Sequence, residues 1–150
     1  MKQNHPQFTA IHRNKLSAPV AWLLKKNKIQ GRILDYGCGH GKDARLLGQQ
    51  GHIVEIYDPY YAPSLPQEQF DTILCIYVLN VLEPEPRLAA YKNVIARLKQ
   101  GGHAYFAVRR DITEDGYRGI EGRKTYQATV KLDIPCIYET SKFAIYEFEQ

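Results

Sequence analysis

Three glycines and two acids are the residues of this sequence that are best spaced to do chemistry. Gly37, Gly39 and Gly41 alternate with single residues, and Asp35 precedes the first of them by two positions. Glycine lets a backbone turn tightly and lets a ligand approach more closely than a Cβ would permit. A carboxylate at Asp35 would repel a pyrophosphate but could pair with an ammonium group. Asp58 follows Gly41 by 17 residues, and there it could accept hydrogen bonds from both hydroxyls of a ribose.

The glycine spacing departs from the dinucleotide-binding pattern. A G-x-G-x-x-G motif would need its third glycine at position 42, where the sequence has Lys42. This disfavours a nicotinamide-dependent dehydrogenase. A further alternative is that the glycines only shape a tight turn between a strand and a helix.

The elements that must position these residues follow from the hydrophobic pattern. It predicts short strands at Arg32–Tyr36 and Ile53–Tyr57, with a helix over 42–50 between them. Later in the chain it predicts a strand at Asp71–Val78, a helix over 86–98 and a strand at His103–Val108. Two final strands, Cys136–Glu139 and Phe143–Phe148, are predicted to form an antiparallel hairpin. This alternation predicts an α/β fold with a doubly wound, mainly parallel sheet. Ligands of such sheets bind beyond the carboxyl ends of the strands, where the glycines and Asp58 stand.

The segment Ile33–Lys42 resembles motif I of the class I S-adenosylmethionine-dependent methyltransferases, a hydrophobic strand followed by D-x-G-x-G-x-G. The resemblance implies that Asp35 contacts the methionine amino group of the cofactor and that Asp58 binds its ribose. It implies a cofactor site made of Asp35, Tyr36, Gly37, Cys38, Gly39, His40, Gly41, Asp58, Pro59, Ile76 and Tyr77. Adenine contacts would come from Ile76 and Tyr77, or from Tyr60 and Tyr61.

Two further segments narrow the resemblance. Arg13–Val20 and Tyr77–Pro84 look like a small bacterial group described as methyltransferases associated with DNA phosphorothioation. Asp58 and Asp71 leave room for a loop only, so we expect a minimal Rossmann-like methyltransferase sheet without the usual third-strand region. The Asn-Pro-Pro-Tyr motif of enzymes that methylate amino groups of bases is absent, which disfavours base N-methylation by that route.

The methyl acceptor is not identified by these motifs. Tyr77, Asn80 and Arg110 are the candidates to orient it, because each lies at or just beyond the carboxyl end of a predicted strand. Arg109 and Arg110 together could grip a phosphate or carboxylate, or form surface salt bridges with nearby acids. We expect a nucleic acid or a small anionic metabolite as acceptor. The alternative is a non-catalytic module that binds S-adenosylmethionine and serves as a regulatory or partner subunit.

The charge of +4 is unevenly distributed, since residues 1–34 hold seven Lys or Arg and no acid. We expect a single domain over 1–150, in which residues 1–30 form a basic arm and a helix packed on the rest. Ser17 is the predicted N-cap of that helix. By the resemblance, Arg13 and Lys15 lie over the cofactor pocket and meet the methionine carboxylate.

Composition excludes several classes of protein. The chain is 44% hydrophobic and 24% charged, which excludes a disordered or collagen-like chain. No apolar stretch approaches the ~20 residues of a membrane span. The three cysteines lack zinc-ligand spacing and suit a reducing compartment. We therefore expect a cytoplasmic protein with no metal and no membrane partner.

Overall fold

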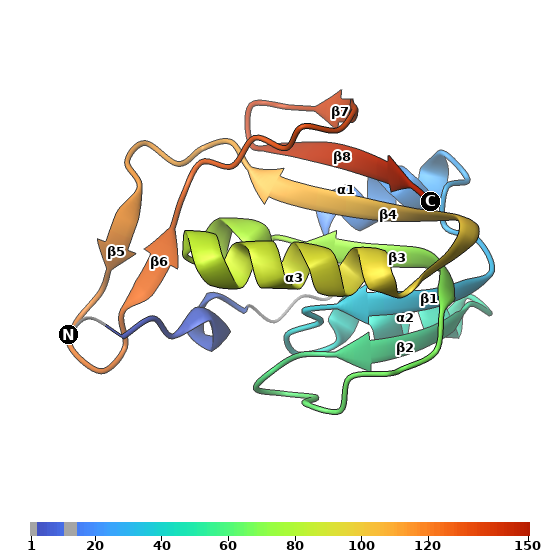
Figure 1. The fold of residues 1–150 in the computed structure, drawn as a ribbon, viewed down its shortest axis with the longest axis horizontal. Coiled ribbons are helices and arrows are strands. Elements are labelled where there is room, and N and C mark those ends of the chain that lie inside the picture. The colour runs from blue at the N-terminus through green and yellow to red at the C-terminus, as the bar shows by residue number, and fades with distance from the viewer. Residues whose placement is uncertain (1–2, 11–14) are drawn as a thin grey trace.

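Six strands form the central sheet of the computed structural model, which describes residues 3–10 and 15–150. In the order β2-β1-β3-β4-β8-β7, they are Ile53–Tyr57, Arg32–Tyr36, Phe70–Ile76, Leu98–Arg109, Phe143–Glu149 and Cys136–Glu139. β2, β1, β3 and β4 run parallel, whereas β8 pairs antiparallel with both β4 and β7. The parallel strands therefore end at one edge of the sheet, on the left of Figure 1. This confirms the predicted sheet with its terminal antiparallel hairpin.

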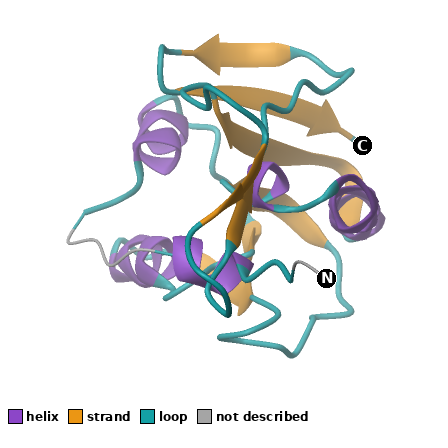
Figure 2. Cartoon of the chain, turned by 90° about the vertical axis from the view of Figure 1, so that its left-hand side faces the viewer, coloured by secondary structure: helices purple, strands orange, loops and turns teal. Residues whose placement is uncertain are grey.

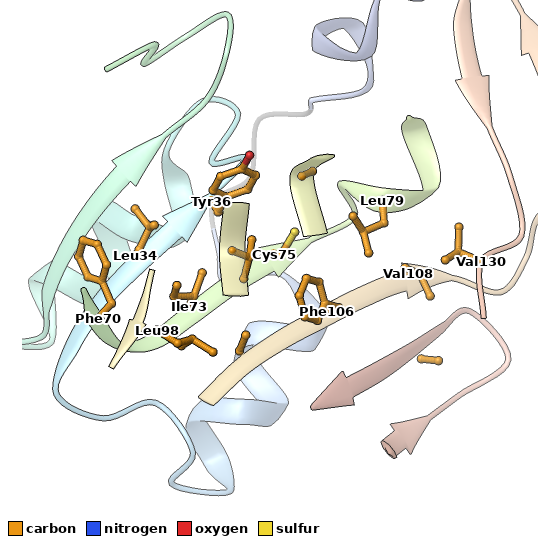
Figure 3. Packing of buried hydrophobic residues seen from close by; sticks show 14 residues of the cluster. Leu34, Tyr36, Phe70, Ile73, Cys75, Leu79, Leu98, Phe106, Val108 and Val130 are labelled. Carbon is orange, nitrogen blue, oxygen red and sulfur yellow. The ribbon is translucent and has the colours of Figure 1, made fainter. Parts of the chain in front are cut away.

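Helices cover both faces of the sheet because its central strands are apolar on both sides. α3 (Pro84–Ala96) covers one face, and α1 (Ala18–Lys25) and α2 (Lys42–Gln49) cover the other (Figure 1). Successive residues of β1 alternate between the two cores: Leu34 packs with the α3 face and Ile33 with the α1 face. Figure 3 shows the core on the α3 face, where Leu34, Phe70, Ile73 and Phe106 gather. None of the helices among the described residues is long and apolar enough to cross a membrane.

α1 is tied to α2 through one acidic side chain. Ser17 stands at the predicted N-cap of α1, but its side chain does not cap that helix. Its hydroxyl donates to Asp43 Oδ2 at 2.7 Å, and its N–H donates to Asp43 Oδ1 at 2.8 Å. Asp43 lies in the first turn of α2, where a carboxylate also suits the helix dipole.

Several element boundaries differ from the sequence prediction, and two of these differences have a physical reason. β3 ends at Ile76 rather than at residue 78, because Tyr77 adopts a φ of +60° and turns the chain out of the strand. β4 begins at Leu98 rather than at residue 103, because Leu98 pairs with Phe70 across an irregularity in the register. α3 begins two residues earlier than predicted.

The chain between β2 and β3 is a loop over residues 58–69, as predicted from its length. Asp58 and Ala62 pair in an isolated bridge, and Arg97 Nε donates to the Pro66 carbonyl at 2.8 Å. This Pro-rich loop takes the place of a third strand, so β2 is the edge of the sheet.

A second, two-stranded sheet lies across the carboxyl ends of the parallel strands. β5 (Gly116–Arg118) pairs antiparallel with β6 (Thr125–Gln127), and Figure 2 shows this hairpin in front of the main sheet. Two short 3-10 helices lie nearby, η1 (Pro6–Thr9) and η2 (Leu79–Val81). The sequence predicted an irregular loop after β4 and neither of these elements.

Candidate functional site

The glycine loop after β1 is packed so closely that its first glycine cannot be replaced without collision. Gly37 has a φ of +80°, and a Cβ built on it would overlap Val78 Cγ2. Gly39 has a φ of +56°, and its Cβ would come within 3.2 Å of Ala10 Cβ. The loop therefore needs glycine for close approach as well as for its left-handed backbone.

Four N–H groups of this loop donate to acceptors within the protein itself. Gly37 and Cys38 both donate to the Tyr57 carbonyl, at 2.7 and 2.9 Å. Gly39 donates to Asp58 Oδ2 at 3.0 Å, and Gly41 donates to the Cys38 carbonyl at 2.9 Å. A loop that cradles phosphates aims such N–H groups at the ligand. This arrangement argues against a dinucleotide site.

Asp58 organises the turn at the end of β2. Besides Gly39, it accepts hydrogen bonds from the N–H groups of Tyr60 and Tyr61 on Oδ1, at 2.9 and 3.0 Å. A carboxylate has about four lone-pair directions. Three of these directions accept hydrogen bonds from the protein, so one is left for a ligand hydroxyl. The sequence had predicted that Asp58 accepts hydrogen bonds from two ribose hydroxyls.

Two carboxylates, Asp35 and Asp58, contribute negative charge around the loop. Asp35 is buried, at 4% exposure, and lies close enough to influence Cys38 and Cys75. Burial raises the pKa of Cys38 to about 12, and the Asp35 and Asp58 carboxylates add to this shift. Burial, with Asp35 again contributing, raises the pKa of Cys75. Two carboxylates around a desolvated pocket disfavour anions there and favour a cation such as a sulfonium or ammonium.

These shifts predict the order in which the cysteines react. At pH 8 a thiol with a pKa of about 12 is ionised to roughly one part in ten thousand. Iodoacetamide is therefore expected to label the exposed Cys136 at least about 100-fold faster than Cys38 or Cys75, measured by peptide mass spectrometry. Asp35→Asn removes one negative neighbour and is expected to speed the labelling of Cys38. Equal labelling of Cys38 and Cys136 in the wild type would contradict the burial of Cys38, and unchanged labelling of Cys38 in Asp35→Asn would contradict the influence of Asp35.

A cavity of about 610 Å³ joins this loop to the ends of β3 and β4. Ten of the residues predicted for the cofactor or the acceptor line it: Tyr36, Gly37, Cys38, Gly39, His40, Asp58, Pro59, Ile76, Tyr77 and Asn80. Tyr60, one of the alternative adenine contacts, lines it as well. A larger hollow of about 780 Å³ lies against α2, β2 and the Pro-rich loop, and Gly41 is the one predicted residue that lines it. We therefore place the site in the smaller cavity.

Four residues that the sequence predicted for the site are not part of the lining of this cavity. Asp35 lies beneath it, buried among neighbouring strands. Lys15 is exposed and does not line it. Arg110 is engaged elsewhere: Nη1 donates to the Thr140 carbonyl at 2.5 Å, and Nε lies 3.8 Å from Glu139. Arg13 lies outside the described residues.

Tyr77 is held in an unusual backbone conformation at the end of β3. Its φ of +60° belongs to the left-handed region, which is uncommon for a bulky residue. Its N–H still donates to the Ala107 carbonyl of β4, at 2.8 Å. Strained residues of this kind gather at functional sites, and Tyr77 lines the cavity.

Asn80 and Gln127 form a buried amide pair at the far end of the cavity. Asn80 is fully buried, and its Nδ2 donates to Gln127 Oε1 at 3.0 Å. Asn80 Oδ1 has no hydrogen-bond partner. Sequence reasoning found Asn80 from its place after β3 but missed Gln127, because β6 itself was not predicted.

Charged groups at this end of the cavity come from β4 and the turn before β8. Arg109 lines the cavity in place of its neighbour Arg110, together with Asp111 and Lys142. Asp111 accepts two hydrogen bonds from Arg109, at 2.8 and 2.9 Å. This pairing lowers the pKa of Asp111. One cation is thus left in excess among these three side chains.

The N-terminal segment 3–10, here called the roof, lies against the same cavity through Pro6, Gln7, Thr9 and Ala10. Asn4 fastens it on one side: Nδ2 donates to the Val81 carbonyl at 2.8 Å and to Glu83 at 2.6 Å, and Oδ1 accepts from the Tyr126 N–H. Tyr61 of the Pro-rich loop donates to the Gln7 carbonyl on the other side, at 3.2 Å. No sequence pattern identified these anchors.

Among residues 3–10 and 15–150, no three His, Cys, Asp or Glu side chains are grouped so that they could hold a metal ion.

The sheet order and the glycine loop after β1 are those expected of a Rossmann-like methyltransferase, and comparisons with known proteins agree. The sequence model of the methyltransferase domain family matches residues 8–136, so the chain belongs to this family. A comparison with curated proteins found no match.

Solved structures share the fold at low sequence identity. 1,6-Didemethyltoxoflavin-N1-methyltransferase of Burkholderia thailandensis, solved with its acceptor and S-adenosylhomocysteine, is 16% identical over 89% of this chain and 77% of its own, with a TM-score of 0.65. Magnesium protoporphyrin IX methyltransferase of Synechocystis, solved with S-adenosylhomocysteine, is 16% identical over 89% and 80%, with a TM-score of 0.58. The glycopeptide N-methyltransferase MtfA is 11% identical over 87% and 88%, with a TM-score of 0.60.

The chain is therefore an S-adenosylmethionine-dependent methyltransferase, and S-adenosylmethionine is its cofactor.

Proposed function

We propose that this methyltransferase acts on a small anionic acceptor bound between Tyr77, Asn80 and Arg109, as a single domain over 1–150. The observation that carries the proposal is the continuity of one cavity, which runs from the glycine loop and Asp58 to these three residues. A donor and an acceptor bound at its two ends would meet in the middle, beside the strained Tyr77.

The residues at the glycine loop fit the proposed placement of the cofactor. Bound S-adenosylmethionine supplies a methyl group activated by a positively charged sulfur, so the protein mainly has to align the acceptor. Asp35 and Asp58 supply negative charge for a cationic ligand that carries no phosphate, and the remaining lone pair of Asp58 can accept from a ribose hydroxyl. Gly37 and Gly39 keep the backbone low enough for the ligand to lie on it.

The acceptor end supports a small anionic molecule rather than a nucleic acid. The excess cation among Arg109, Asp111 and Lys142 can pair with one carboxylate or phosphate. Arg110 and Lys15, which could have extended a phosphate-binding surface, do not line the cavity. The roof and the β5–β6 hairpin lie over the strand ends, which suits a molecule that fits inside.

Two finer expectations stay part of this proposal. Membership of the phosphorothioation-associated group rests on the segments Arg13–Val20 and Tyr77–Pro84 alone. A reducing, cytoplasmic location rests on the three cysteines.

Isosteric removal of each acid tests the cofactor end. Asp35→Asn and Asp58→Asn are each expected to weaken S-adenosylmethionine binding about 10- to 100-fold in calorimetry, because each removes a charged partner while keeping its shape. Asp133→Asn is the matched control, since Asp133 is exposed and does not line the cavity. Unchanged affinity for S-adenosylmethionine in both test variants would contradict this placement of the cofactor.

A methyl-transfer assay tests the acceptor. Labelled S-adenosylmethionine is incubated with the protein and a cell extract, and the extract is then divided by nuclease, protease and size. Label in the small-molecule fraction is expected. Label lost on nuclease treatment would show a nucleic-acid acceptor, and label in no fraction would favour the non-catalytic binding module.

A further inference from the structure

We propose that Asn93 of α3 recognises the adenine ring of S-adenosylmethionine, and that Tyr36 holds the Asn93 amide in position for this contact. The inference rests on the proposed function, which places the cofactor between the glycine loop and Asp58, and it assigns the partner of the base in the same cavity. The sequence had assigned no residue of α3 to this role.

One wall of the cavity is a single face of α3. Pro86, Ala89, Ala90 and Asn93 line the cavity, and residues three and four positions apart lie on the same side of a helix. Asn93 is the one residue of these four whose side chain carries hydrogen-bonding groups, and Val78 continues the apolar wall from the chain after β3. A wall of this kind suits a flat heteroaromatic ring, which has apolar faces and a polar edge.

This wall adjoins the proposed contact with the ribose. Tyr36 ends β1 immediately before Gly37, and it pairs in register with Tyr57, the residue that precedes Asp58. The rings of Tyr36 and Tyr57 lie 4.9 Å apart. On its other side, the Tyr36 hydroxyl accepts a hydrogen bond from Asn93 Nδ2 at 3.2 Å. Tyr36 therefore connects Asn93 to the strand ends that carry the glycine loop and Asp58, so a base attached to a ribose at Asp58 can lie along the α3 wall.

The Asn93 side chain has hydrogen-bonding capacity left for a ligand. A side-chain amide offers two N–H donors and an oxygen acceptor. In the described part of the chain, the protein uses one of these donors, for Tyr36, and leaves Oδ1 and the second N–H of this partly exposed residue without a partner. Adenine matches the two groups, because its 6-amino group can donate to Oδ1 while the neighbouring ring nitrogen accepts from the N–H. Burial raises the pKa of Tyr36, so the pair is neutral, as suits an uncharged base.

The other polar side chains of the lining are less suited to recognise the base. His40 lies against Tyr61, with ring centroids 4.6 Å apart, and Lys42 offers donors only. The two buried amides at the far end of the cavity bond to each other. Gln7 of the roof also carries an amide, but its hydrogen bonds within the described residues fix its main-chain carbonyl and not its side chain. Asn93 is already held by Tyr36, so it loses less conformational freedom when a ligand binds.

The first test removes the 6-amino group from the ligand. S-adenosylhomocysteine and its analogue with hydrogen in place of the 6-amino group are each titrated into the full chain, and both affinities are measured by calorimetry. Wild type is expected to bind the analogue about 10-fold more weakly, because Asn93 Oδ1 then has no donor. Equal affinities of wild type for the two ligands overturn the inference.

The second test combines this change of ligand with a change of residue. Asn93→Leu removes the amide, and leucine favours a helix, so the fold is expected to be retained. This variant is expected to bind S-adenosylhomocysteine about 10-fold more weakly than wild type and to bind the two ligands within about threefold of each other. A preference of about 10-fold that persists in Asn93→Leu overturns the inference.

Tyr36→Phe tests the positioning role of the hydroxyl. The substitution removes the acceptor that holds the Asn93 amide and keeps the ring that packs beside Tyr57. The preference for S-adenosylhomocysteine over the analogue is expected to fall to about threefold, between wild type and Asn93→Leu. A preference that stays at the wild-type value overturns the role of Tyr36.

Two further variants complete the experiment. Gln49→Leu is the matched control, because Gln49 is also an amide on a helix but is exposed and does not line the cavity. It is expected to bind both ligands as wild type does. Gln7→Leu is expected to keep the 10-fold preference. If the preference is lost in Gln7→Leu and kept in Asn93→Leu, the roof recognises the base and the inference is overturned.

Failure of the proposed function is observed separately from failure of this inference. Unchanged affinity in both Asp35→Asn and Asp58→Asn contradicts the placement of the cofactor and overturns both. The ratio of the two affinities reports on the base alone. Weakened binding in the aspartate variants, together with a ratio that Asn93→Leu does not change, overturns this inference and leaves the proposed function standing.

Discussion

Gly37→Ala is expected to lower the free energy of unfolding by about 3 kcal/mol and to abolish measurable binding of S-adenosylmethionine. A left-handed backbone costs an alanine about 1–2 kcal/mol, and Gly37 has a φ of +80°. The new Cβ would also overlap Val78 Cγ2, and overpacking of this kind costs about 1–3 kcal/mol. Relief requires the loop to move away from β3, which displaces the surface on which the cofactor is proposed to lie. Urea unfolding measures the first effect, and calorimetry measures the second.

A second glycine of the same loop provides a control that separates the steric overlap with Val78 from the cost of the left-handed backbone. Gly41 has nearly the same φ, +79°, but a Cβ built on it would meet nothing within 4 Å. Gly41→Ala is therefore expected to lose only the backbone part, about 1–2 kcal/mol. The double variant Gly37→Ala, Val78→Ala should recover much of the difference as a coupling free energy. Equal losses at both glycines, with no coupling to Val78, would contradict the close packing of the loop on β3.

Local patterns in the sequence were sufficient to predict the strands and the loop that surround the glycine loop. The strands at Arg32–Tyr36 and Ile53–Tyr57 have the predicted bounds, because each is a short apolar run that ends at a glycine or a proline turn. The loop between Asp58 and Asp71 was predicted from length alone, since the 12 residues between them cannot hold a strand with a helix on each side. Chain connectivity dictated these features, so they could be predicted without knowledge of the packing.

The residues at the acceptor end of the cavity could not be predicted from local patterns, because their positions depend on strand register and packing. Side chains alternate along a strand, so a shift of one position moves a side chain to the opposite face. This is why Arg109 lines the cavity whereas Arg110 contacts Glu139 and Thr140. The left-handed turn at Tyr77 likewise depends on the surrounding packing.

The β5–β6 hairpin and the roof could not be predicted for a related reason. β5 and β6 have three residues each, too few for a periodic pattern to be recognised. The contacts that hold them join residues far apart in the chain, such as Tyr126 and Asn4. Asn4 carries no local signal of this role. The unpaired oxygen of Asn80 is equally a property of packing and not of residue type.

Deletion of residues 1–10 is expected to lower kcat/KM for methyl transfer at least about 100-fold while leaving the protein folded. The roof contributes four residues to the cavity wall, and its loss admits water and frees the acceptor to adopt unproductive orientations. η1 buries none of its own residues, and a segment without buried side chains contributes little to the stability of the core. Methyl-transfer kinetics, calorimetry with S-adenosylmethionine and thermal unfolding measure the three consequences separately.

A point substitution in the roof distinguishes its position from its mere presence. Asn4→Ala removes three hydrogen bonds that fasten the roof to η2, to Glu83 just before α3 and to β6, each worth about 1 kcal/mol, and is expected to lower kcat/KM about 10- to 100-fold. Gln3→Ala, at the exposed neighbouring residue, is expected to stay within about twofold of wild type. If the deletion and Asn4→Ala both retain wild-type kinetics, the roof takes no part in binding. If only the deletion is impaired, the roof acts through its own lining residues and needs no anchor at Asn4.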